Sequence, residues 1–243
     1  MLKSCEMKSI CICEQGCVRR INQDCAVQFS EGTCGLYLVA DGMGGHYAGE
    51  KASRAAAATF TLWWETYRMM PQRPNFVQVV NQLKEEIKQC HQKIQQFTPP
   101  GQICGTTLVL LWINDKQYAL FSIGDSRCYQ VRRRGMIPQV IQLTSDDIVR
   151  QEVMGNRKGN KLSRALGVGE KCLYAVQIGE ISRHSIFALC TDGVYKVYPD
   201  KRWSKTLLRA IFGVSLHKTG MAISREVIKN GAPDNFSLVL IEV

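Results

Sequence analysis

Several aspartates occupy equivalent places in the sequence, each where an apolar segment starts or stops. They are Asp41, Asp125, Asp192 and Asp234. Asp and Gly are common turn formers, so any one of these places alone could be an ordinary turn. Strand ends of one sheet, however, tend to gather on one side of a molecule. Acids repeated at such ends therefore indicate one shared site.

Unpaired carboxylates cannot be crowded together without a compensating positive charge, which a divalent cation supplies. Oxygen ligands suit Mg²⁺ or Mn²⁺, and these motifs offer no thiolate or imidazole for zinc. Gly42 beside Asp41 lets a backbone carbonyl turn toward the ion and leaves room for its waters. Two such ions a few ångströms apart lower the pKa of a shared water, and the resulting hydroxide cleaves phosphate esters. Arg19 is the candidate for binding the phosphate, because a guanidinium binds it through two parallel hydrogen bonds.

The elements around these acids indicate antiparallel sheets covered by helices. Apolar runs predict strands over residues 36–40, 106–113, 118–123, 127–131, 185–190 and 236–243. Helical spacing predicts helices over 48–67 and 76–97 and two more between 203 and 229. For the polar region 144–161 we expect a short helix and a loop. Strands joined by tight turns, with helices in separate blocks, argue against a βαβ repeat.

Composition is that of an ordinary globular protein of 243 residues, and we expect one domain over 1–243. The 11 cysteines are expected to be reduced and mostly buried. The net charge of +10 fits either a basic surface that helps solubility or attraction to phosphate-bearing partners, and no aromatic nucleic-acid motif accompanies it. No segment has the length and apolarity to span a bilayer, and the N-terminus lacks the pattern of a signal peptide. We therefore expect a cytoplasmic protein without nucleic-acid binding or membrane insertion.

A series of short motifs occurs in the order known from one enzyme family. The motifs are "GCVRRINQD", "VADGMGGH", "CGTTLV", "SIGDSRCY", "LTSDD", "LSRALG", "TDGV" and "APDNFSLVLI". With them the chain resembles the metal-dependent, type-2C serine/threonine protein phosphatases, in particular their compact bacterial members. The resemblance runs from about residue 8 to the C-terminus.

The resemblance implies an α+β fold, a four-layer αββα sandwich of two packed antiparallel sheets flanked by helices. It implies two core Mn²⁺ or Mg²⁺ ions bridged by Asp41, one also bound by the Gly42 carbonyl and the other by Asp192 and Asp234. Asp24 would hold metal-bound water, Arg19 the substrate phosphate, and Asp125 with Asp192 a third, weaker ion. A metal-bridging hydroxide would attack phosphoserine or phosphothreonine directly. The implied partners are phosphoproteins, expected to be substrates of a eukaryotic-like Ser/Thr kinase, and we expect a monomer.

The chain departs from the family pattern at several positions. Met43 follows Asp-Gly, where some relatives have a histidine proposed as general acid, and we assign His46 no such role. Asp146-Asp147 follows "LT", where "DH" is frequent. The flap, at about residues 146–161, is short, so we expect phosphoprotein recognition to differ from that of relatives or to rest on Arg157, Lys158 and Lys161. A solvated loop would explain these three basic residues equally well.

Three alternatives belong to other classes. Cys13 and Arg19 have the spacing of a cysteine-nucleophile phosphatase loop, although no His precedes the cysteine and Arg20 replaces the usual Ser or Thr. A second alternative is an inactive, phosphoprotein-binding homologue, against which the full set of aspartates argues. A third is a basic nucleic-acid-binding protein, which the lack of a base-stacking motif disfavours.

Overall fold

Two antiparallel sheets form the centre of the computed structural model, which describes residues 7–44, 48–134, 137–153, 157–182, 185–198 and 200–243. The five-stranded sheet has the order β1 (Lys8–Glu14), β13 (Phe236–Glu242), β12 (Ile186–Cys190), β7 (Arg127–Arg134), β8 (Ile137–Gln142). The six-stranded sheet has the order β11 (Ala175–Glu180), β6 (Gln117–Ile123), β5 (Leu108–Asn114), β3 (Cys34–Gly44), β2 (Asp24–Glu31), with β4 (Cys104–Thr106) pairing with β3.

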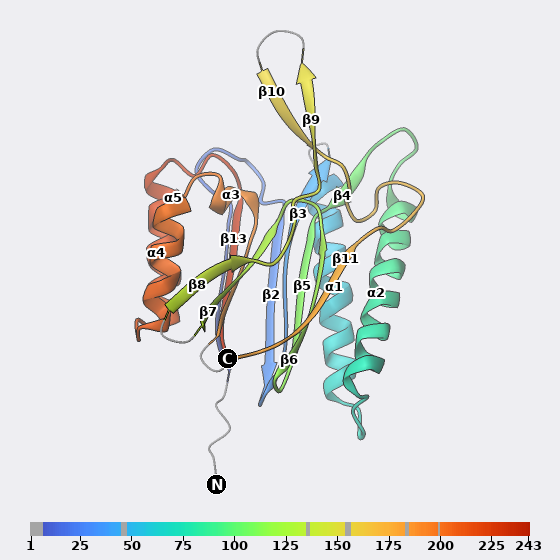
Figure 1. The fold of residues 1–243 in the computed structure, drawn as a ribbon. Coiled ribbons are helices and arrows are strands. Elements are labelled where there is room, and N and C mark those ends of the chain that lie inside the picture. Colours follow the sequence, from blue (N-terminus) through green and yellow to red (C-terminus); the bar gives the residue numbers. More distant parts are fainter. Residues whose placement is uncertain (1–6, 45–47, 135–136, 154–156, 183–184, 199) are drawn as a thin grey trace.

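Helices cover the outer face of each sheet (Figure 1). The six-stranded sheet packs against α1 (Ala48–Arg68) and α2 (Phe76–Phe97). The five-stranded sheet packs against α4 (Asp200–Ile211) and α5 (Leu216–Lys229), and the short α3 (Asp192–Tyr195) follows β12. The predicted four-layer αββα sandwich is confirmed. No described helix combines the length and apolar composition needed to cross a lipid bilayer.

The strand "LYLVA" shows how the layers follow from the sequence. Leu36, Leu38 and Ala40 of β3 belong to the core beneath α1 and α2. Tyr37 and Val39 alternate with them and belong to the core between the two sheets. Because successive side chains of a strand point to opposite faces, a strand buried on both sides reads as a continuous apolar run.

The predicted helices agree closely with the structure. The helix expected over 76–97 is α2, which begins after Asn75, whose side chain accepts a hydrogen bond from the Gln78 N–H in a capping box. The helix expected over 48–67 extends one residue further, to Arg68. The two helices expected between 203 and 229 are α4 and α5.

The strand predictions were less complete. The expected strand 106–113 is interrupted at Thr107, which separates β4 from β5. The helix expected within 144–161 is wrong, because β9 (Ile148–Val153) and β10 (Arg157–Leu162) form a separate two-stranded sheet. Figure 1 shows this hairpin projecting from one end of the sandwich. Its strands pair with each other rather than with a buried sheet, so the apolar pattern of a core strand is missing.

Candidate metal centre

Asp24 and Asp41 face each other on neighbouring strands of the six-stranded sheet. Asp24 begins β2 and pairs with Asp41 in the register of β2 and β3. The Asp41 N–H donates to Thr107 Oγ1 at 2.9 Å, and the Thr107 N–H donates back to the Asp41 carbonyl at 2.8 Å. Thr106 Oγ1 also donates to this carbonyl at 3.0 Å. The interruption between β4 and β5 therefore fixes the backbone from which the Asp41 carboxylate projects.

Asp192 and Asp234 flank two neighbouring strands of the five-stranded sheet. Asp192 is the first residue of α3, directly after β12, and Asp234 lies just before the neighbouring β13. Asn235 was not predicted as a site residue. Its side chain donates to the carbonyls of Gln15 and Ile21 at 2.7 and 3.0 Å. It thus ties the loop that carries Arg19 to the start of β13.

The structure brings the predicted aspartates into one electrostatic cluster. Burial raises the pKa of Asp41 well above its usual range, and Asp24, Asp192, Asp125 and Asp234 raise it further. Burial likewise raises the pKa of Asp24 to about 7, although hydrogen bonds to its carboxylate oppose this. Acids spread from residue 24 to 234 in sequence therefore repel one another at one end of the sandwich.

The carboxylate of Asp24 is held on one side only. Thr191 Oγ1 and Ser237 Oγ donate to its Oδ2 at 2.8 and 2.9 Å. Its Oδ1 is buried and has no hydrogen-bond partner among the described residues, and the same is true of Asp192 Oδ1. Buried carboxylate oxygens without partners are costly unless a cation or water binds them.

Two basic side chains already contact the cluster. Arg19 Nη2 lies 2.7 Å from Asp234 Oδ2. Lys196, which was not predicted, pairs with Asp192 Oδ2, and its Nζ lies 3.8 Å from Asp125 Oδ2. The sequence signal for this lysine is its spacing of four residues from Asp192, which makes the two side chains neighbours on one helical turn.

The donor set fits a hard divalent cation. In the part of the chain that the structure describes, no three His, Cys, Asp or Glu side chains form a ready-made ligand set for one ion. Arg19 and Lys196 occupy one oxygen each of Asp234 and Asp192, and hard cations also take carbonyl and water ligands. Gly42 leaves no room for a side chain there, since a Cβ would lie 2.2 Å from the Gly49 carbonyl oxygen. The unpartnered carboxylate oxygens of Asp24 and Asp192 favour Mg²⁺ or Mn²⁺.

The acids of "LTSDD" have a structural role at the base of the flap. Asp147 accepts a hydrogen bond from the Gly124 N–H at 3.0 Å and donates its own N–H to the Gly124 carbonyl at 2.9 Å. Asp146 accepts from Arg127 Nη2 at 2.7 Å. Both contacts fix the turn that carries Asp125, whose pKa burial and Asp192 raise. In the flap, Lys161 is exposed, whereas the side chains of Arg157 and Lys158, like all of His46, lie outside the described part.

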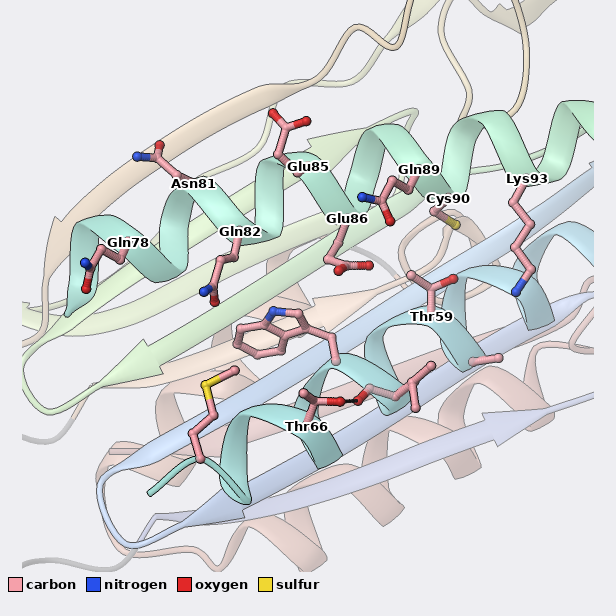
Figure 2. A pocket seen from close by; sticks show the side chains of 14 residues that line it. Thr59, Thr66, Gln78, Asn81, Gln82, Glu85, Glu86, Gln89, Cys90 and Lys93 are labelled. Carbon is pink, nitrogen blue, oxygen red and sulfur yellow. Dashed lines mark hydrogen bonds between the residues drawn. The ribbon is translucent and has the colours of Figure 1, made fainter. Parts of the chain in front are cut away.

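A groove of about 940 Å³ lies elsewhere, on the outer layer between α1 and α2. Figure 2 shows Gln82 and Glu86 of α2 facing Thr59 and Thr66 of α1 across this space. None of the predicted site residues lines the groove, so we do not assign the chemistry to it.

The cysteine-nucleophile alternative is not supported. Cys13 lies in β1, where its Sγ accepts from Ser237 Oγ at 3.3 Å and from Asn22 Nδ2 at 3.5 Å. Although Cys13 is exposed, desolvation by its neighbours raises the pKa of its thiol, whereas such a nucleophile needs a lowered pKa.

Half of the ten described cysteines are buried, fewer than expected, and none of the ten is in a disulfide.

Comparisons with known proteins bear on the family and the fold of this chain. A family model described as protein phosphatase 2C matches residues 19–225. Serine/threonine phosphatase stp of Listeria welshimeri is 26% identical over 245 residues, covering 94% of this chain and 93% of the relative. The structure of PppA of Pseudomonas aeruginosa superimposes with a TM-score of 0.80 at 26% identity, covering 98% of each chain. The catalytic domain of PstP in complex with 2 manganese ions superimposes with a TM-score of 0.73 at 23% identity, again covering 98% of each chain.

Proposed function

The chain belongs to the protein phosphatase 2C family, so it is a serine/threonine protein phosphatase, and we propose that it works with two core Mn²⁺ or Mg²⁺ ions held by its clustered aspartates. Asp41 would be shared by both ions. The Gly42 carbonyl would bind one of them, and Asp192 and Asp234 the other. The observation that carries this proposal is the convergence of Asp41, Asp192 and Asp234 from two different sheets. The two manganese ions of the PstP structure support it.

When bound, the ions would supply an acidified water as nucleophile and neutralise the phosphoryl oxygens. Asp24 would orient that water through Oδ1, because its Oδ2 is already held by Thr191 and Ser237. Arg19 would bind the phosphate of the substrate. Its contact with Asp234 places the guanidinium beside the acid cluster, where the phosphate would bind. Met43 has no proton to donate, so the leaving serine or threonine oxygen would take its proton from water.

The substrates would be proteins phosphorylated by a Ser/Thr kinase. Recognition would involve the flap hairpin, which projects beside the metal centre and carries the exposed Lys161 together with Arg157 and Lys158. We further propose that the protein acts as a monomer in the cytoplasm.

Asp192→Asn tests the metal assignment. The variant keeps the shape of the side chain but removes its negative charge, so it should fold normally. Its rate of phosphate release from a phosphothreonine peptide with Mn²⁺ should fall at least about 100-fold. Circular dichroism checks the fold, and Lys205→Gln on α4 serves as a surface control. EDTA should abolish wild-type activity, whereas thiol alkylation should spare it. Wild-type turnover by Asp192→Asn would refute the assignment, and inhibition by alkylation alone would revive the cysteine mechanism.

A further inference from the structure

A lysine side chain lies between the two aspartates that were expected to hold a third metal ion. Lys196 pairs with Asp192 Oδ2, and its Nζ is 3.8 Å from Asp125 Oδ2. We propose that the Lys196 ammonium group replaces the third ion, so that this phosphatase works with two metal ions and one built-in positive charge. The inference rests on the proposed two-metal function.

The backbone fixes the position of this ammonium group. The Lys196 N–H donates to the Asp192 carbonyl at 3.0 Å, which closes the turn of α3. Residues four apart on such a turn are neighbours, so the side chains of Asp192 and Lys196 meet wherever the turn forms. The contact therefore does not depend on a distant loop.

The other aspartate is tied to the same short helix. Tyr195 OH donates to the Asp125 carbonyl at 3.0 Å. The guanidinium of Arg127 lies over the Tyr195 ring at 3.6 Å, and Arg127 also binds Asp146. The turn that carries Asp125 is thus held against α3, with its carboxylate directed near the lysine.

The two oxygens of Asp192 have different surroundings. Oδ2 contacts the ammonium group, whereas Oδ1 is buried and has no partner among the described residues. Oδ1 is therefore free for a core ion, while Oδ2 is already neutralised. A third divalent ion between Asp192 and Asp125 would have to displace Lys196 or lie beside a like charge, which is unfavourable at such short range.

A covalently attached charge has a consequence for metal dependence. An ion bound weakly at a third position would leave at low metal concentration, whereas an ammonium group stays. We therefore expect activity to saturate once the two core ions are bound, without a second activation phase at higher Mn²⁺ concentration.

Counting bound Mn²⁺ tests the proposal without using activity. The signal of free Mn²⁺ in electron paramagnetic resonance is followed while the metal is titrated into metal-free protein. Wild type should bind two ions per chain, and Lys196→Arg, which keeps the charge, should also bind two. Lys196→Gln, which removes the charge without adding a carboxylate ligand, should bind a third ion more weakly than the first two. Lys205→Gln, the same change at an exposed position on α4, should bind two.

The outcomes separate this proposal from the proposed function. Three ions on wild type would overturn the role of Lys196 and leave the two core sites standing. A count of two for folded Lys196→Gln would also overturn it. Fewer than two ions on wild type would refute the two-metal function itself. Circular dichroism checks that Lys196→Gln folds, and three ions on wild type would overturn the role of Lys196 whatever the variant does.

Discussion

Gly193→Ala should inactivate the enzyme while leaving it folded, because Gly193 sits where α3 touches the start of β13. A Cβ atom on Gly193 would lie 1.9 Å from the Asn235 carbonyl oxygen and 3.1 Å from Phe236 Cβ. Real Cβ atoms essentially never come within 3.0 Å of other atoms, so the two segments must move apart by at least about 1 Å. Asn235 cannot give way easily, since its side chain is bound to three backbone groups of residues 15–23.

Moving α3 and the start of β13 apart displaces the proposed metal ligands. Asp192 directly precedes Gly193, and Asp234 directly precedes Asn235, so the substitution separates their carboxylates. Metal–ligand distances tolerate only about 0.2 Å, and a displacement of about 1 Å in an active site can cost about 100-fold in rate. Overpacking itself costs about 1–3 kcal/mol, a fraction of the roughly 5–15 kcal/mol that stabilises a domain. The variant should therefore fold and lose at least about 100-fold in kcat/KM.

The measurement combines Mn²⁺-dependent hydrolysis of p-nitrophenyl phosphate, Mn²⁺ binding and urea unfolding. Gly213→Ala is the matched control, because a Cβ there meets nothing within 4 Å, although its φ of +92° makes alanine strained. The free energy of unfolding of this control should fall by about 1–2 kcal/mol, and its activity should stay at the wild-type level. A Gly193→Ala protein with activity and Mn²⁺ affinity within about threefold of wild type would show that the two acids do not act as one ligand set.

Three further outcomes are expected. In EDTA Asp24 alone should lower the free energy of unfolding by about 3 kcal/mol between pH 4 and 7, because it binds a proton more tightly in the folded state, with a pKa of about 7, than in the unfolded chain. Asp24→Asn should remove this share of the pH dependence in urea titrations, and equal slopes for the two proteins would contradict it. Arg19→Ala should lower kcat/KM for a phosphopeptide by about 10–100-fold with Mn²⁺ affinity nearly unchanged, as steady-state kinetics and metal titration can show. Cys13→Ser should keep activity within about twofold in the same assay, and its inactivation would reopen the thiolate mechanism.

The parts of the fold that could be read from the sequence are those buried on two sides or on one helical face. The run Leu36–Ala40 is apolar throughout, and α2 has apolar residues along one face, so both patterns indicate burial directly. The hairpin of β9 and β10 could not be read, because its two strands pair only with each other. Strands β8 and β11 were missed for a related reason, since they lie at sheet edges and few of their side chains are fully buried.

The acids of the candidate site could be located because each lies at a strand end beside a small or turn-forming residue, which is a pattern of neighbouring residues. The residues that contact these acids could not be located from the sequence, except Arg19. Thr191 and Ser237 reach Asp24 only because β12 and β13 lie next to each other and pack against β2. Arg19 was proposed from its chemistry, but its contact with Asp234 spans most of the chain. Lys196 was missed even though its signal is local, because α3 was not expected.

The division of the acids between the sheets gives the metal centre a structural as well as a chemical role. Asp24 and Asp41 belong to one sheet, whereas Asp192 and Asp234 lie at the ends of two inner strands of the other, so the cluster exists only when the sheets are packed. Packing them without a cation forces buried carboxylates together, which opposes folding at this end of the sandwich. A ligand that binds only the folded state stabilises it by about 2.7 kcal/mol at 100 times its Kd. Cation binding should therefore stabilise the packing of the two sheets as it assembles the catalytic site. The fixed charge of Lys196 offsets part of the repulsion between the carboxylates before any ion binds.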